Sequence, residues 1–368
     1  MLPFFREKFG NAASRTHAVG REAAAAVQGA REQIAALVGV RECEDVIFTS
    51  GATESDNLAL QGTLDASEKK HVVTLVTEHS AVLETCRALE ARHAASVTYV
   101  PVQTDGLVDL NALRDAIRPE TCLVSVMAAN NEIGVLQPLR EIGRVCRDRN
   151  VLFHTDAAQA AGKIRLDVEQ DMIDLMSLTA HKVYGPKGVG ALFVRRRHPT
   201  LKRLKLNPIM FGGGHERGYR SGTLNVPAIA GMGEAYRLAK TEMPTDAKRV
   251  GEMRDKLLSL LRRELGDVRL NGHATHRLFG NLHVTLDGVD AESLMMRLPN
   301  LAISSGAACS TTKVEPSHVL KAIGLSDQAT KYSLRIGVGR FNAPAEIESA
   351  ADAISKAAKL LRSFVASR

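Results

Sequence analysis

The stretch that decides the fold is Val46-Ile47-Phe48-Thr49-Ser50-Gly51-Ala52-Thr53-Glu54. A short apolar run, a Ser-Gly pair and helix-forming residues follow one another, which predicts a strand, a tight turn and a helix that opens near Thr53. The same alternation continues with apolar runs at 72–76, 97–100, 122–127, 151–154, 175–178 and 190–194. Helical patterns at 82–89, 110–117 and 139–149 separate several of them. Near-continuous apolar strands between helices predict an α/β fold with a mainly parallel sheet covered by helices on both faces.

The pattern changes after about residue 234. A long amphipathic helix is predicted over 233–261, with a break at Pro244, and a closing helix over 345–365. Shorter strands are predicted near 282–286 and 332–336. We therefore expect a large domain over residues 1–235 and a smaller C-terminal α+β domain over residues 236–368.

The composition is that of an ordinary globular protein, with 368 residues, 45% hydrophobic and 24% charged. Aromatic residues make up only 4% and Trp is absent, which argues against a stacking surface for single-stranded nucleic acid. The net charge of +7 is modest, and we expect the basic stretch between Arg195 and Lys205 to be a solvated surface turn. Neither a signal peptide nor an apolar run of membrane-spanning length is found.

Five cysteines are present, at positions 43, 86, 122, 146 and 309. Their number is odd and no Cys-x-x-Cys pair occurs, so a disulfide framework or a cysteine-rich zinc site is not expected. Cys309 lies among small polar residues in Ser304-Ser305-Gly306-Ala307-Ala308-Cys309-Ser310, outside any apolar stripe. The other four fall within helix or strand patterns and are predicted to be packing residues. This usage is typical of the reducing cytoplasm, with Cys309 as the candidate reactive thiol.

The turns after the predicted strands contain the candidate binding residues, because ligands of such sheets bind at the strand ends. The segment from Ser50 to Thr53 is either a phosphate site at a helix N-terminus or an ordinary Thr N-cap. Asp156 is either a partner for a cationic ring nitrogen or a helix N-cap. Lys182 is either a nucleophile for carbonyl compounds or a surface lysine. In combination, a strand-end Asp, a Lys about 26 residues later and an anion-binding turn match the requirements of pyridoxal phosphate.

The chain resembles the cysteine desulfurases that serve iron–sulfur cluster assembly, in the pyridoxal-phosphate-dependent aminotransferase class V family. The resemblance covers essentially the whole chain and rests on motifs that occur in order. They are 49–57 (TSGATESDN), 77–79 (TEH), 130–134 (NNEIG), 156–159 (DAAQ), 181–188 (HKVYGPKG), 212–218 (GGGHERG), 220–223 (RSGT), 304–309 (SSGAAC), Arg335 and 339–341 (GRF).

The resemblance implies a fold-type-I transferase whose large domain binds the cofactor and whose small domain has a mobile loop with Cys309. Lys182 is implied to form the Schiff base and move the substrate Cα proton, Asp156 to keep the pyridine nitrogen protonated, and His79 to stack on the ring. The remaining implied contacts are Ala52, Thr53, Thr179 and His181 with the phosphate, Gln159 with the ring oxygen, Asn131 with the cofactor, and the partner subunit's Thr223 with the phosphate across a homodimer. Asn131 and Arg335 are implied to bind the substrate carboxylate.

The implied activity is conversion of L-cysteine to L-alanine, with the sulfur held as a Cys309 persulfide. The sulfur then passes to an acceptor or to an iron–sulfur scaffold protein. No metal is expected apart from transient iron–sulfur ligation by Cys309.

Other functions remain as alternatives. A selenocysteine lyase or β-elimination enzyme would need no persulfide-forming thiol. A catalytically impaired sulfur-transfer partner is the second alternative, because the family usually begins with a strand and an Ala-Thr-Thr loop, whereas this sequence starts later, at Met1-Leu2-Pro3. A nucleic-acid-binding module is a distant third.

Overall fold

The computed structural model describes residues 1–197, 204–305 and 316–366 of the chain. These residues form two compact units. The first comprises residues 1–100, 110–128 and 138–243, and the second comprises residues 101–109, 129–137 and 244–368. No helix in the described ranges is long and apolar enough to cross a membrane.

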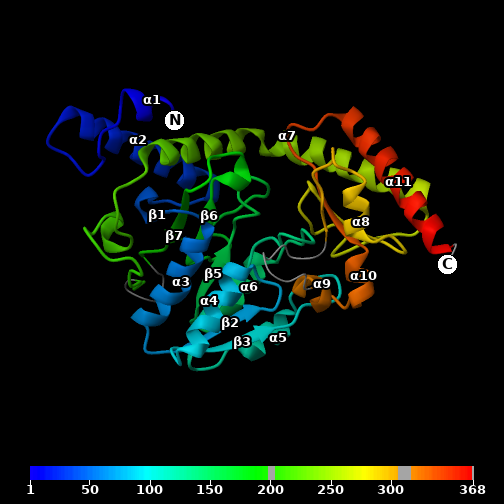
Figure 1. Ribbon diagram of the computed structural model, residues 1–368. Coiled ribbons are helices and arrows are strands. Elements are labelled where there is room, and N and C mark those ends of the chain that lie inside the picture. The colour runs from blue at the N-terminus through cyan, green and yellow to red at the C-terminus, as the bar shows by residue number, and fades with distance from the viewer. Residues whose placement is uncertain (198–203, 306–315, 367–368) are drawn as a thin grey trace. The chain divides into compact units, whose positions relative to one another are not determined.

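The first unit is built on a seven-stranded sheet (Figure 1). In spatial order its strands are β1 (Val46–Thr49), β7 (Gly190–Val194), β6 (Leu175–Thr179), β5 (Leu152–Asp156), β4 (Thr121–Ser125), β2 (His71–Leu75) and β3 (Ser96–Val100). Neighbours from β6 to β3 pair in parallel, and only β7 runs antiparallel to its two neighbours. The prediction of an α/β fold with a mainly parallel sheet is therefore confirmed.

Burial explains why these apolar runs form strands. All residues of the central strands β2, β4, β6 and β7 are buried, as expected for strands rich in Val, Leu and Ile. Of the two edge strands, β1 is also buried throughout and β3 is partly exposed. Helix α3 (Ala52–Ala66) packs on β6 and β7 and also contacts β1, β4 and β5 (Figure 1). The other helices of this unit are α1 (Pro3–Arg6), α2 (Ala18–Val38), α4 (Ser80–Ala91), α5 (Leu110–Ala116), α6 (Leu139–Asp148) and the first part of α7 (Val226–Leu265).

The second unit has a four-stranded antiparallel sheet. In spatial order its strands are β10 (Ser304–Ser305), β11 (Ser333–Gly337), β9 (Asn281–Leu286) and β8 (Val268–Leu270). Its helices are the rest of α7, α8 (Ala291–Met296), α9 (His318–Ala322), α10 (Asp327–Lys331) and α11 (Pro344–Ala366). Apolar residues of α7, β9, β11 and α11 form its core, among them Leu257, Val284, Leu334 and Ile354.

Two local predictions are wrong. Helix α7 continues through Pro244 without a break. The helix contributes buried residues on both sides of the proline, including Tyr236 and Val250, and this packing offsets the one backbone hydrogen bond that proline cannot donate. Arg195 is also not solvated: it is buried, and it forms ion pairs with Glu169 at 2.9 Å and Asp174 at 3.3 Å.

Candidate active site

The parallel strands β5 and β6 bring four of the predicted residues to the edge of the sheet where both strands end. Asp156 is the last residue of β5 and pairs with Ser177 of β6, which ends two residues later at Thr179. The chain then turns into a short 3₁₀ segment, η2 (His181–Val183), which contains Lys182. Asp156, Thr179, His181 and Lys182 therefore follow from the ends of neighbouring strands, where ligands of such sheets bind.

Asp156 combines burial with nearby positive charge. It is 6% exposed, and one carboxylate oxygen accepts the Ala158 N–H at 2.8 Å. Burial raises the pKa of Asp156, whereas the Ala158 N–H and the charges of His79 and Lys182 lower it. His79 and Lys182 are thus both within electrostatic reach of this carboxylate. A helix N-cap was one of the two roles predicted for Asp156. In the structure Asp156 caps a local turn and not a helix.

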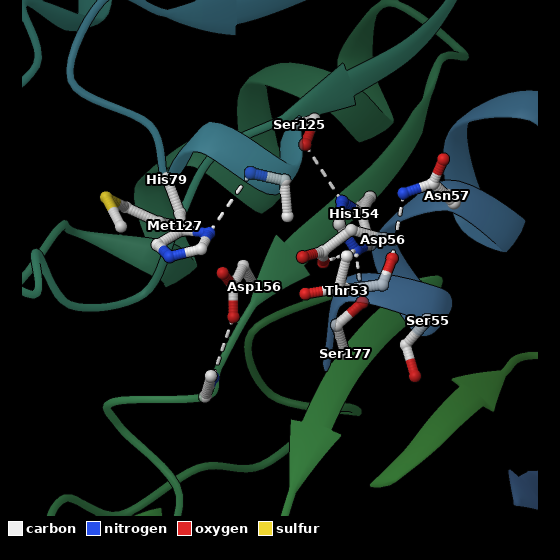
Figure 2. Close-up of polar contacts among 12 residues, drawn as sticks. Thr53, Ser55, Asp56, Asn57, His79, Ser125, Met127, His154, Asp156 and Ser177 are labelled. Carbon is white, nitrogen blue, oxygen red and sulfur yellow. Dashed lines mark hydrogen bonds and ion pairs between the residues drawn. The ribbon is translucent and has the colours of Figure 1, made fainter. Parts of the chain in front are cut away.

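His79 is held by the helix that follows it. It is the N-cap residue of α4, and its Nδ1 accepts the Ala81 N–H at 3.1 Å (Figure 2). Because Nδ1 accepts, the proton of the neutral ring resides on Nε2. The residue itself is exposed. The ring can therefore stack on a ligand and still present an N–H at its outer nitrogen.

The N-terminus of α3 offers backbone donors for an anion. Gly51 is the N-cap residue, and within the described part of the chain no side chain caps the helix at this residue, so the N–H groups of the first turn can bind a ligand. Thr53 is the second residue of the helix, and the alternative of a Thr N-cap is wrong. Gly190 of β7 permits this arrangement, because a Cβ there would lie 2.7 Å from the Gly51 backbone. Thr53 is exposed on the first turn.

The Thr179 hydroxyl and His181 Nδ1 lie 2.9 Å apart on the next turn of the sheet edge. Burial and the charges of Lys182 and Lys187 lower the pKa of His181, which favours the neutral ring. A neutral imidazole and a hydroxyl are suitable hydrogen-bonding partners for a phosphate.

A salt bridge ties the 220–223 segment to the first turn of α3. The Arg220 guanidinium donates to both Glu54 oxygens, at 2.8 and 3.3 Å. Burial opposes ionisation of Glu54, but the bonds from Arg220 and Ser50 lower its pKa overall. Thr223, three residues after Arg220, is exposed. Its side chain is therefore accessible from outside the chain.

Gln159 has a defined amide orientation. Its Oε1 accepts a hydrogen bond from Lys163 Nζ at 3.1 Å. The amide NH₂ group is then the part of Gln159 that remains to donate to a ligand. Burial and the charge of Lys182 lower the pKa of Lys163 to about 8.

The second unit brings Asn131 and Arg335 together. Arg335 lies on β11 and donates to the backbone oxygen of Asn131 at 2.9 Å and to the Ser304 hydroxyl at 3.3 Å. Both Asn131 and Arg335 are half-buried. A guanidinium held in this way is suited to binding a carboxylate.

Cys309 lies outside the described residues. Of the other cysteines, Cys86, Cys122 and Cys146 are buried, and burial raises the thiol pKa of Cys86 to about 12 and of Cys122 to about 11. Cys43 differs from the prediction because it lies half-buried in a short 3₁₀ segment, where burial and Glu44 raise its pKa. None of these four has the character of a reactive thiolate.

The sequence analysis missed a buried polar cluster behind this edge of the sheet. Figure 2 shows Asp56 of α3 beside His154 of β5 and Ser177 of β6, near Asp156. Strand alternation could have indicated this cluster. Because His154 and Asp156 are two residues apart on one strand, their side chains face the same side of the sheet. The second indication was Asp56, a carboxyl group among the apolar residues of a helix that packs on the sheet.

The whole chain is similar to known proteins. The sequence model described as "Aminotransferase class-V" matches residues 1–349. The chain is 46% identical to "Cysteine desulfurase IscS" of Rickettsia bellii over 98% of this chain and 87% of that protein. It is 49% identical to the protein of the same name from Dechloromonas aromatica, over 95% and 85%. A solved structure titled "NIFS-LIKE PROTEIN" has a TM-score of 0.88 and 35% identity, covering 99% of this chain and 94% of that one.

The chain therefore belongs to the aminotransferase class-V family, among its cysteine desulfurases. Cysteine desulfurases of this family depend on pyridoxal phosphate.

Proposed function

We propose that this cysteine desulfurase uses Lys182, Asp156 and His79 to bind its cofactor and move protons during turnover. The observation that carries the proposal is that Asp156 ends β5 and Lys182 follows the end of the neighbouring parallel strand β6, and the charges of Lys182 and His79 lower the pKa of the buried Asp156. An amine, a carboxylate and an imidazole are the groups required for a Schiff base, a ring-nitrogen partner and a stacking ring.

The other residues present also fit pyridoxal phosphate. The uncapped N-terminus of α3, Thr179 and His181 would hold the phosphate, and the Gln159 NH₂ group would donate to the ring oxygen. When bound, the cofactor supplies an electron sink for negative charge that develops at the substrate Cα.

We assign the steps to the chain's own groups as follows. Arg335 binds the L-cysteine carboxylate through its fork of N–H groups, with Asn131 beside it. The Lys182 amine removes the Cα proton of the substrate. The ammonium group so formed then donates a proton to a second atom of the bound substrate and cofactor. His79 shields the reacting atoms on one side and presents its Nε2–H to them.

The sulfur step balances as a displacement at sulfur. The Cys309 thiolate attacks the substrate sulfur, the new S–S bond forms, and the Cβ–S bond breaks with its electron pair left on carbon. That carbon takes up a proton, and L-alanine is released while Cys309 retains the persulfide. An acceptor thiol or an iron–sulfur scaffold protein then takes the sulfur. We further propose that the enzyme is a cytoplasmic homodimer.

Cofactor spectroscopy tests the binding assignments. We expect Lys182→Ala to lose the visible absorbance of the lysine-bound cofactor, whereas Lys187→Ala, at a neighbouring exposed lysine, retains it. Asp156→Asn should bind cofactor but form little alanine, because the amide cannot stabilise a protonated ring nitrogen. Normal turnover by Asp156→Asn would contradict the role given to the carboxylate.

Subunit mixing tests the dimer and Thr223. Lys182→Ala and Thr223→Glu protomers are each expected to be inactive alone, since the second places a negative charge against the phosphate. If the phosphate is held by the partner subunit's Thr223, random mixed dimers regain about one quarter of wild-type activity, because half of the dimers carry one intact site. If Thr223 acts within its own protomer, mixing restores nothing.

A further inference from the structure

Asp56 is the centre of a buried polar cluster behind Asp156. It lies on α3 beside His154 of β5 and Ser177 of β6, and the His154 ring links it to Ser125 of β4 (Figure 2). All four residues are 0% exposed. Water therefore cannot solvate a charge on any of them.

The cluster has a defined order of contacts. His154 Nδ1 lies 2.8 Å from the Ser125 hydroxyl, and His154 Nε2 lies 3.0 Å from the Ser177 hydroxyl. The Asp56 carboxyl approaches His154 Nε2 at 3.7 Å. Neither Asp56 oxygen has a hydrogen-bond partner among the residues that the structure describes. A full negative charge at Asp56 would thus have at most the Ser177 hydroxyl beside it, which is fewer donors than a buried carboxylate requires.

A charge on His154 does not compensate for this lack. Both ring nitrogens of His154 already face serine hydroxyls, and burial lowers the pKa of His154 to about 3. The imidazole is therefore neutral at ordinary pH. Burial also raises the pKa of Asp56 well above its usual range, as do the charges of Asp156 and Glu78, while the Ser177 hydroxyl opposes the increase.

Asp156 has the support that Asp56 lacks. It accepts the Ala158 N–H, and the positive charge of Lys182 lowers its pKa. Two carboxyl groups that share one buried region cannot both ionise without a large cost, so the better supported one takes the charge.

We propose that Asp56 is a positioning residue that holds a proton as a neutral carboxylic acid, so that the negative charge of this cluster resides on Asp156. Its relevance to catalysis rests on the proposed function, in which Asp156 faces the cofactor ring nitrogen. The protonation of Asp56 itself does not depend on that function. The titratable groups whose charges act on Asp56 are Asp156 of β5 and Glu78 from the segment after β2, and His154 and the Ser177 hydroxyl lie beside it.

The pH dependence of stability tests the proton directly. An unfolded Asp loses its proton near pH 4, whereas folded Asp56 keeps it to higher pH. Unfolding of the wild type then releases a proton, so its stability decreases relative to Asp56→Asn as the pH rises through this window. The ratio of the two unfolding constants should change roughly tenfold per pH unit, or about 1,000-fold between pH 4 and pH 7 if Asp56 stays protonated throughout. A ratio that is constant over this range would overturn the proposal.

A spectroscopic experiment distinguishes a neutral Asp56 carboxylic acid from a charged carboxylate. In holoenzyme, Asp56→Asn should leave the midpoint of the cofactor's absorbance titration unchanged, because a neutral amide replaces a neutral acid. A change of a whole pH unit or more would mean that Asp56 is charged in the native protein and would refute the proposal.

Infrared spectroscopy provides a measurement that does not require Asp56→Asn to fold. The wild type at neutral pH should show a carboxylic acid band that persists in Glu78→Gln, and absence of that band in Glu78→Gln would refute the proposal. A wild type that binds no pyridoxal phosphate would contradict the proposed function, while the unfolding and infrared results would still decide the state of Asp56.

Discussion

Replacing Glu216 by Gln tests how the glycine-rich 211–223 segment is anchored to the sheet. The two Glu216 oxygens accept from Arg31 Nη2 at 2.7 Å and Nη1 at 2.8 Å, and one of them also accepts the Phe48 N–H at 2.7 Å. The side chains of Arg31 and Glu216 are only 6% and 3% exposed. Gln has a single acceptor oxygen, so its NH₂ group must face an Arg31 N–H in either orientation, donor against donor, and in one orientation it also faces the Phe48 N–H.

The change also leaves the Arg31 guanidinium buried without its counter-charge. Breaking a buried ion pair in this way costs about 3–5 kcal/mol of unfolding free energy. We expect this loss in urea unfolding followed by circular dichroism. The matched control is Glu234→Gln, which breaks the exposed pair with Arg237 and should leave the unfolding midpoint unchanged. Equal midpoints for Glu216→Gln and Glu234→Gln would refute the reasoning.

The remaining predictions concern three separate positions. Gly190→Ala should destabilise the protein by about 1–3 kcal/mol in the same unfolding assay, because the new Cβ would lie 2.5 Å from the Leu178 oxygen; an unchanged midpoint would contradict this contact. Lys163 has a pKa lowered by burial to about 8, so the wild type should gain stability relative to Lys163→Met as the pH rises from 8 toward 10.5, by roughly tenfold in the unfolding constant per pH unit. A flat difference would show that Lys163 titrates normally. Arg335→Lys should raise the KM for L-cysteine roughly tenfold through loss of the two-pronged contact, whereas Arg269→Lys, at a half-exposed arginine, should not.

The large sheet could be predicted from the sequence because its strands carry their signal locally. Runs such as 122–127 and 190–194 are buried throughout and contain few polar residues, so apolar continuity alone identifies them. The continuity of α7 could not be predicted, because it depends on tertiary contacts on both sides of Pro244 that outweigh a local helix-breaking residue.

The candidate site was predictable where a residue has a fixed place after a strand, as Asp156 and Lys182 do. The buried polar residues behind the candidate site were harder to predict from the sequence. From the sequence, Arg195 was predicted to be a surface residue. It is buried because it forms ion pairs with Glu169 and Asp174, 26 and 21 positions earlier in the chain. Asp56 and His154 belong to different elements, and only the packing of α3 on the sheet brings them within 3.7 Å.

The most direct test of the account is product analysis of the holoenzyme with L-cysteine and a reductant. We predict that the wild type releases L-alanine and carries a persulfide on Cys309, and that Lys182→Ala and Cys309→Ala each remove most of the alanine. Cys146→Ala, at a buried cysteine, should retain alanine release. Alanine release by Cys309→Ala at the wild-type rate in the same assay would contradict sulfur transfer to this thiol, and a wild type that forms no alanine would contradict the proposed activity.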